Sequence, residues 1–116
     1  MNYTQIDNLI NEYINNISCY SIGKNSIKYD CCKITFIKTK KINEIIVFEI
    51  YIFKKYRNKG SCKYFLQFLV DNIKEKSILC IETVLSIILH NILLNFMYNG
   101  KRFILKKQGY YLVSIK

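Results

Sequence analysis

A β-strand, a basic glycine turn and an amphipathic helix follow one another between residues 47 and 73. Val47–Phe53 is rich in β-branched and aromatic residues, which favour a strand. After Gly60, apolar residues recur at the spacing of one helix face, namely at Cys62, Phe65, Leu66, Leu69, Val70 and Ile73. The start of such a helix presents unpaired backbone N–H groups and the positive end of the helix dipole. The arrangement therefore predicts an anion site at this turn.

The turn between the strand and the helix is unusually basic. Cations are concentrated in it, at Lys54, Lys55, Arg57 and Lys59, and Lys63 follows in the first turn of the expected helix. The whole chain holds 18 basic residues among 116, so this density is well above the average. Charge alone nevertheless fits a solvated lysine-rich turn as well as it fits a phosphate site.

The order of residues in the turn favours the phosphate site. Arg57-Asn58-Lys59-Gly60-Ser61-Cys62 resembles the Arg/Gln-x-x-Gly-x-Gly/Ala signature of the GNAT superfamily of N-acetyltransferases. In that family the loop binds the pyrophosphate of acetyl-CoA, so the resemblance implies acetyl-CoA as co-substrate, held by this loop and Lys63. It also implies that the backbone of Ile50, Tyr51 and Ile52 pairs with the pantetheine arm. Asn91 is a further candidate cofactor contact, or else a residue of a solvated helix face.

The chain is expected to form one domain, residues 1–116, of the α/β class with a mixed sheet. Periodicity and turn residues predict its elements in order. They are a helix with an apolar face from Ile6 to Ile17, a turn at Gly23–Ser26, strands at Ile27–Tyr29, Cys32–Lys38, Glu44–Phe53 and Ile78–Val84, helices from Gly60 to Lys76 and Ser86 to Asn99, and a closing hairpin of Arg102–Leu105 with Tyr110–Ile115.

The helix after Gly60 is long enough for a crossover, so the strands on either side of it are expected to pair in parallel. From Ile45 to Lys116 the order of elements resembles the GNAT fold. The resemblance implies a GNAT-like acyl-CoA N-acyltransferase fold, with three to four helices around the central sheet.

Two glutamates are candidates for the base that acetyl transfer to an amine requires. Glu82 lies within the apolar run LCIETVL, where burial would raise the pKa of its carboxyl, and it aligns with a catalytic glutamate of several family members. It also fits a glutamate paired with a lysine. Glu49 lies next to the pantetheine segment and also fits an ordinary exposed strand residue. The family often has a tyrosine acid where this chain has Phe96.

Composition restricts the remaining partners. Five cysteines without a Cys-x-x-Cys spacing and a single histidine predict no metal site. The net charge of +10 comes mostly from lysine in a chain rich in Ile, Asn, Lys and Tyr, so a specific nucleic-acid partner is not expected. Residues 78–97 are too polar for a lone transmembrane span, and the N-terminus lacks the pattern of a signal peptide. We therefore expect a cytoplasmic protein without a membrane partner. The sequence is compatible with either a monomer or a homodimer.

Together these features predict an acetyl-CoA-dependent N-acetyltransferase that acts on a primary amine of an unidentified acceptor. The alternative is a catalytically weak or inactive acyl-CoA-binding interaction module, which the phenylalanine at position 96 favours. A basic nucleic-acid-binding protein is a third reading that depends on charge alone.

Overall fold

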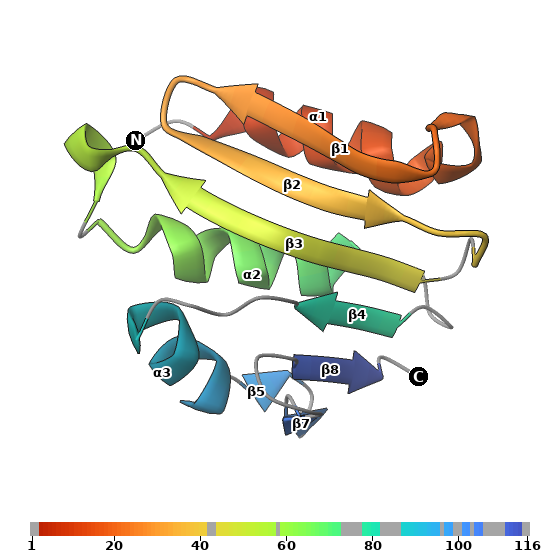
Figure 1. The fold of residues 1–116 in the computed structure, drawn as a ribbon. Coiled ribbons are helices and arrows are strands. Elements are labelled where there is room, and N and C mark those ends of the chain that lie inside the picture. The colour runs from red at the N-terminus through yellow and green to blue at the C-terminus, as the bar shows by residue number, and fades with distance from the viewer. Residues whose placement is uncertain are drawn as a thin grey trace.

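The computed structural model describes residues 3–41, 44–57, 59–72, 78–81, 87–95, 97–98, 101–102, 104–105 and 111–114. Its helices are α1 (Thr4–Asn15), α2 (Ser61–Asn72) and α3 (Ile87–Asn95), with short 3-10 helices η1 (Ile17–Cys19) and η2 (Lys54–Tyr56). The strands are β1 (Gly23–Tyr29), β2 (Cys32–Lys38), β3 (Glu44–Ile52), β4 (Ile78–Ile81), β5 (Met97–Tyr98), β6 (Lys101–Arg102), β7 (Ile104–Leu105) and β8 (Tyr111–Ser114). The chain is thus a small α/β protein with a mixed sheet, as expected (Figure 1).

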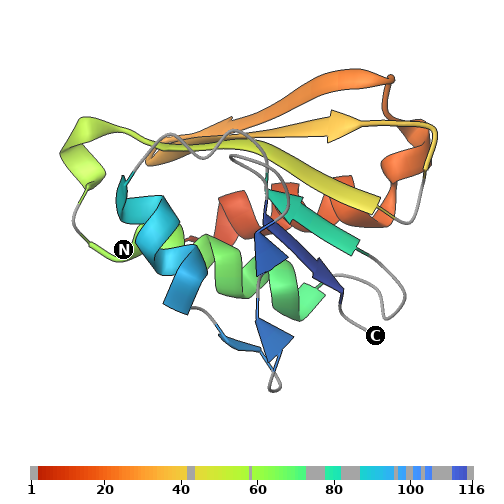
Figure 2. The same cartoon turned by 60° about the horizontal axis from the view of Figure 1, so that its bottom comes forward.

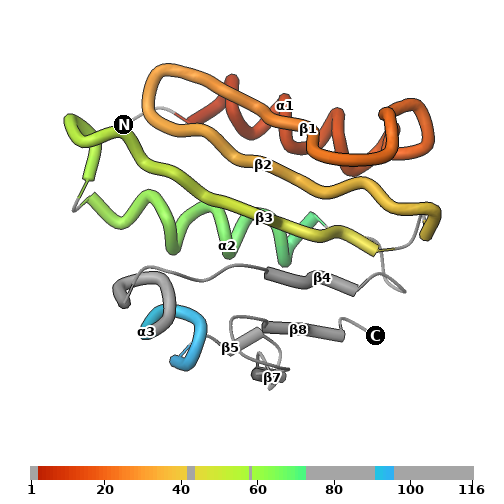
Figure 3. Tube along the Cα trace, viewed as in Figure 1, coloured from red at the N-terminus to blue at the C-terminus, as the bar shows by residue number. Residues whose placement is uncertain are grey.

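One sheet has the strand order β1-β2-β3-β4-β8-β7, and β5 pairs with β6 separately. The first three strands form an antiparallel meander (Figure 3). The predicted parallel pairing across α2 is also confirmed, although it joins Glu44–Val47 of β3 to Ile78–Ile81 of β4 rather than the later residues of β3. The closing hairpin is confirmed as β7 and β8, with Ile104 opposite Leu112.

Helices α1 and α2 both lie on one face of β1, β2 and β3 (Figure 2). Alternation along β2 directs Cys32, Ile34 and Phe36 to this face, where they are fully buried. The apolar stripes of the two helices cover these side chains and complete one core, to which Ile6, Ile10, Tyr13, Ile14, Phe65, Leu66, Leu69 and Val70 belong. Tyr13 stacks on Phe36 with ring centroids 4.2 Å apart. We call this the inner face of the sheet.

A β-bulge divides β3 into two halves of different character. Thr35 of β2 lies opposite Glu49, whereas the next residue, Phe36, lies opposite Val47, so Phe48 is the extra residue. Before the bulge, residues 45–47 are buried on both faces. After it, exposed residues on one face alternate with half-buried residues on the other. Beyond the bulge β3 continues to pair with β2 as far as Ile52, whereas no described strand pairs with its other edge there.

Three predicted boundaries are wrong. Gly23–Ser26 is not a turn but the start of β1, where Gly23 pairs with Lys38 at a φ of 117° that suits glycine. The last helix ends at Asn95 rather than Asn99, because residues 97–98 pair with Lys101–Arg102. This pairing also removes Arg102 from the closing hairpin. The predicted ends of the second helix beyond Asn72 and of the fourth strand beyond Ile81 lie outside the described residues.

Candidate anion and cofactor site

The basic turn connects the end of β3 to the start of α2. Residues 54–56 form η2, whose closure is made by the Tyr56 N–H donating to the Phe53 carbonyl at 2.8 Å. Gly60 then has a φ of 75°, in the left-handed region that favours glycine. A Cβ built at this position would meet no atom within 4 Å. The glycine is therefore required by the backbone conformation, while the space in front of it is open.

The start of α2 presents backbone donors without intrahelical acceptors. The first helical bond runs from the Tyr64 N–H to the Gly60 carbonyl at 3.0 Å. The N–H groups of Ser61, Cys62 and Lys63 precede that bond and have no carbonyl four residues earlier in the helix. Lys59 and Lys63 are exposed at this end of α2. Unpaired donors, the helix dipole and nearby cations together form an environment that favours an anion.

Arg57 joins the turn to the last residue of β3. Its Nε donates to the Ile52 carbonyl at 2.8 Å, and its guanidinium carbon lies 5.4 Å from the centroid of the Tyr51 ring. One guanidinium nitrogen is therefore committed to the strand, which fixes the direction of the side chain. The sequence predicts that Arg57 belongs to an anion-binding loop, and in the structure Arg57 holds the turn against the end of β3.

The free edge of β3 carries the backbone groups of Ile50 and Ile52. The Phe53 N–H donates to the Cys31 carbonyl at 3.0 Å, so residue 53 directs its backbone toward the β2 side. In an antiparallel ladder this direction alternates, so Tyr51 also faces β2, whereas Ile50 and Ile52 face the opposite edge. Arg57 occupies the Ile52 carbonyl. Within the described part of the chain, three backbone groups on this edge are therefore without a strand partner and could pair with an extended ligand: the Ile50 N–H, the Ile50 carbonyl and the Ile52 N–H.

A polar cluster between α1 and α2 supports the turn from behind. The Tyr3 hydroxyl lies 2.8 Å from the Ser61 Oγ, and the Tyr3 ring stacks on Tyr64 at 4.2 Å between centroids. The Tyr64 hydroxyl donates to Asp7 Oδ2 at 2.5 Å. Ser61 is only 3% exposed, so its hydroxyl serves the helix contact rather than solvent. Tyr3, Asp7 and Tyr64 were not among the predicted site residues.

Asp7 is the charged member of this cluster. Its Oδ1 atom is buried without a hydrogen-bond partner. Burial raises the pKa of the Asp7 carboxyl above its ordinary value, and the hydrogen bond from Tyr64 opposes this only in part. The same contact with Asp7 adds to burial in raising the pKa of the Tyr64 hydroxyl to about 12. Burial therefore disfavours the charged form of both groups close to the start of α2.

Replacement of Asp7 by asparagine tests this carboxyl. The folded chain binds the Asp7 proton more tightly than the unfolded chain, so the stability from protonated Asp7 is complete below pH ~3.8. It is lost as the pH rises through the raised folded-state pKa. Asp7→Asn keeps an acceptor for Tyr64 without the charge. We expect its melting temperature to rise relative to that of the natural protein at pH 7 and to match it at pH 3.

The matched control is Asp71→Asn, because Asp71 is exposed on α2 and accepts a hydrogen bond from the Gln67 side chain one turn away. This variant should show no such dependence on pH. An equal shift of the Asp7→Asn melting temperature at both pH values would contradict the role assigned to the buried carboxyl.

Cys62 occupies the small-residue position of the motif and is half-buried at the start of α2. Burial raises the pKa of the Cys62 thiol to about 11. A thiol with this pKa is almost wholly protonated at neutral pH, and a protonated thiol is a poor nucleophile. The structure therefore gives Cys62 a packing role at the start of α2.

The remaining predicted residues are distributed unevenly. Glu49 is exposed on the face of β3 opposite to the helices, beside Thr35 of β2. Asn91 is exposed on α3, where its carbonyl accepts a hydrogen bond from the Asn95 side chain at 2.9 Å. Glu82 and Asn58 lie outside the described residues. The structure therefore brings together the turn, the start of α2 and the edge of β3, and leaves the base as a prediction.

Within the described ranges, no group of three or more His, Cys, Asp and Glu side chains is placed to hold a metal ion. None of the helices in the described part of the chain is long and apolar enough to cross a membrane. Comparison with protein-family models, with curated proteins and with solved structures yields no match to this chain.

Proposed function

We propose that this chain binds acetyl-CoA and transfers its acetyl group to a primary amine. The observation that carries the proposal is the junction at residues 50–63. There, a strand edge with free backbone groups leads directly into a basic turn and a helix start with unpaired N–H groups. An extended amide-containing arm can pair with the strand edge while its phosphates lie against the helix start.

The sheet supports a GNAT-like fold for this proposal. The strand–helix–strand unit of β3, α2 and β4 is parallel, and the remaining strands are antiparallel. The described parallel pairing reaches Val47, the residue before the bulge. Among the described residues, no strand pairs with this edge of β3 after Val47, which is the edge that the cofactor would need.

Acetyl transfer requires a base, because an amine must lose a proton before or during its attack on a thioester. We assign this role to Glu82, with Glu49 as the alternative. Glu49 follows the bulge and precedes Ile50, so it is close to the strand edge but points to the outer face. The unpaired N–H groups of α2 and the side chains of Lys59 and Lys63 would neutralise phosphate charge.

A second candidate function is an acyl-CoA-binding interaction module. It uses the same turn and strand edge, and it is favoured by Phe96, which has no proton to donate where the family often has a tyrosine. In either case we place the protein in the cytoplasm. Cys19, Cys31, Cys32 and Cys62 are free thiols, as in reducing compartments.

Thermal stability with and without cofactor tests both candidates. A ligand that binds only the folded chain stabilises it by about 2.7 kcal/mol at a hundred times its dissociation constant. We expect CoA and acetyl-CoA to raise the melting temperature clearly and AMP to raise it little, because AMP lacks both the pyrophosphate and the arm that pairs with β3. No shift at millimolar CoA would contradict the enzyme and the binding module together. Transfer of label from acetyl-CoA to an acceptor in a cell extract then separates the two.

A further inference from the structure

The face of β1, β2 and β3 opposite to α1 and α2, which we call the outer face, is covered by no helix of the described chain (Figure 2). Cross-strand register determines which side chains share it. One row across the sheet holds Lys28, Lys33 and Tyr51, and the next holds Ser26, Thr35 and Glu49. Tyr51 remains 44% exposed. The outer face thus carries lysines on β1 and β2 beside aromatic rings on β3.

The cations of this face lie over the rings. Lys24 Nζ is 3.9 Å from the centroid of Phe48, the bulge residue, and Lys28 Nζ is 5.7 Å from that of Phe53. Both lysines belong to β1 and reach across β2 to the rings of β3. Tyr51 contacts Phe53 edge to face at 5.7 Å. Phe48, Tyr51 and Phe53 therefore form a row along β3, in which Tyr51 contacts Phe53 and the long side chains of Lys24 and Lys28 cover the first and last rings.

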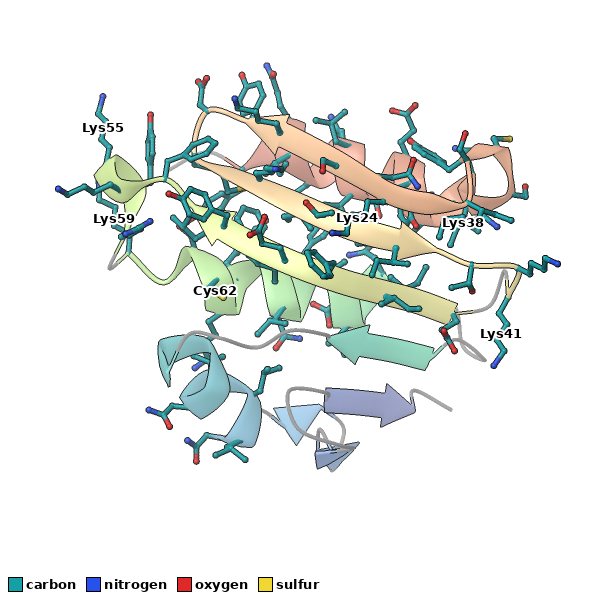
Figure 4. All side chains as sticks on the ribbon, viewed as in Figure 1. Lys24, Lys38, Lys41, Lys55, Lys59 and Cys62 are labelled. Carbon is teal, nitrogen blue, oxygen red and sulfur yellow. The ribbon has the colours of Figure 1, made fainter. Side chains whose placement is uncertain are left out.

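Positive charge is concentrated at the end of this row. Arg57 lies over Tyr51, and Lys55 and Lys59 both lie within 6 Å of the Tyr56 ring centroid. Figure 4 shows Lys55 and Lys59 at this end of the sheet and Lys41 at the opposite end. Among the described residues, the carboxylates nearby are those of Glu49 on the outer face and Asp30 in the turn between β1 and β2. Cations outnumber carboxylates there, so the surface is complementary to a polyanion.

We infer that the outer face binds single-stranded nucleic acid without sequence specificity. Phosphates would attract the ammonium groups of Lys24, Lys28 and Lys33. The side chains of Lys24 and Lys28, which cover rings in the free protein, would then turn toward the sugar–phosphate backbone of the nucleic acid. The uncovered rings of Phe48, Tyr51 and Phe53 would then stack with unpaired bases. An acidic polypeptide would use the charge but not the row of rings, which is why the observations favour nucleic acid. This inference is independent of acetyl-CoA binding.

Paired charge variants test the electrostatic part. Lys24→Gln with Lys28→Gln removes two cations from the outer face, and Lys40→Gln with Lys41→Gln removes two exposed cations from the opposite end. Affinity for a labelled oligonucleotide of about 12 nucleotides is measured by anisotropy across a salt series. The outer-face pair should lower the log–log salt slope by roughly 1.4, at about 0.7 per phosphate on single strands. The control pair should leave it unchanged.

Two substitutions of Tyr51 test stacking. Tyr51→Phe keeps the ring, whereas Tyr51→Leu keeps only apolar volume. Because a base–aromatic stack contributes roughly a 5- to 150-fold gain in affinity, Tyr51→Leu should weaken binding within that range and Tyr51→Phe should bind like the natural protein. Melting temperatures of all variants are compared first. If Tyr51→Leu unfolds, Phe53→Leu replaces it as the test of stacking.

Three results would overturn the inference. Equal losses from the two lysine pairs would show that binding depends on diffuse charge rather than on this face. Competition by polyglutamate as strong as by unlabelled oligonucleotide would indicate an acidic protein as the partner. Displacement of the oligonucleotide by CoA would place the nucleic acid at the Gly60 turn instead of the outer face.

Discussion

Gly60→Val is expected to abolish binding of CoA while the protein remains folded. Gly60 has a φ of 75°, so a β-branched residue costs about 1–3 kcal/mol of stability through backbone strain. A Cβ at this position would meet no described atom within 4 Å, so we expect the core to be unaffected. Loss of two charged hydrogen bonds at about 1.5–3 kcal/mol each corresponds to at least roughly a 100-fold loss of affinity. Calorimetric titration of the folded variant measures it.

Gly60→Asn separates strain from access. Asparagine tolerates the left-handed region better than other side chains, so this variant should lose less stability than Gly60→Val. It still carries a Cβ in the open space, and we expect its affinity for CoA to fall as well. If Gly60→Asn binds CoA as tightly as the natural protein, the glycine serves only the backbone turn and the phosphate lies elsewhere.

The part of the fold set by local patterns was predictable from the sequence. The 3.6-residue spacing of Phe65, Leu66, Leu69 and Val70 placed α2, and the alternation in Cys32–Lys38 placed β2 with its buried face. The turn at Gly23–Ser26 was predicted wrongly because glycine, asparagine and serine favour turns in isolation. Pairing with β2 and two hydrogen bonds from the Asn25 amide, to the Ser21 and Gly23 carbonyls, stabilise the extended form instead.

The candidate site divides in the same way. The Gly60 turn could be predicted because the motif is contiguous, and its positive φ agrees with the choice of glycine. The contacts of Tyr3 with Ser61 and of Asp7 with Tyr64 could not be predicted, because the paired residues are separated by 58 and 57 positions, respectively, along the chain. The row of aromatic rings on the outer face could not be predicted either, because the bulge residue Phe48 determines which side chains of β3 share a face. A register shift of this kind leaves no local sequence signal.

Glu82→Gln is expected to lower acetyl transfer by about 10²–10⁴-fold, the usual contribution of a general base. Glutamine keeps the size and hydrogen-bonding reach of the side chain but cannot accept a proton at neutral pH. Affinity for CoA should stay unchanged, because the Gly60 turn and the edge of β3 hold the cofactor in this proposal. Turnover and CoA titration on the same preparation measure the two effects separately.

Glu49→Gln is the matched control, since Glu49 is the other candidate base and is exposed on the outer face of β3. The dependence of turnover on pH distinguishes the two glutamates, because it reports the titration of the group that acts as the base. If Glu82 is the base, the acid limb of the profile should disappear in Glu82→Gln and persist in Glu49→Gln. The opposite pattern would assign the role of base to Glu49. The bulge at Phe48 would then be the feature that directs the Glu49 side chain. Unchanged turnover in both variants would leave proton removal to water and contradict a carboxylate mechanism.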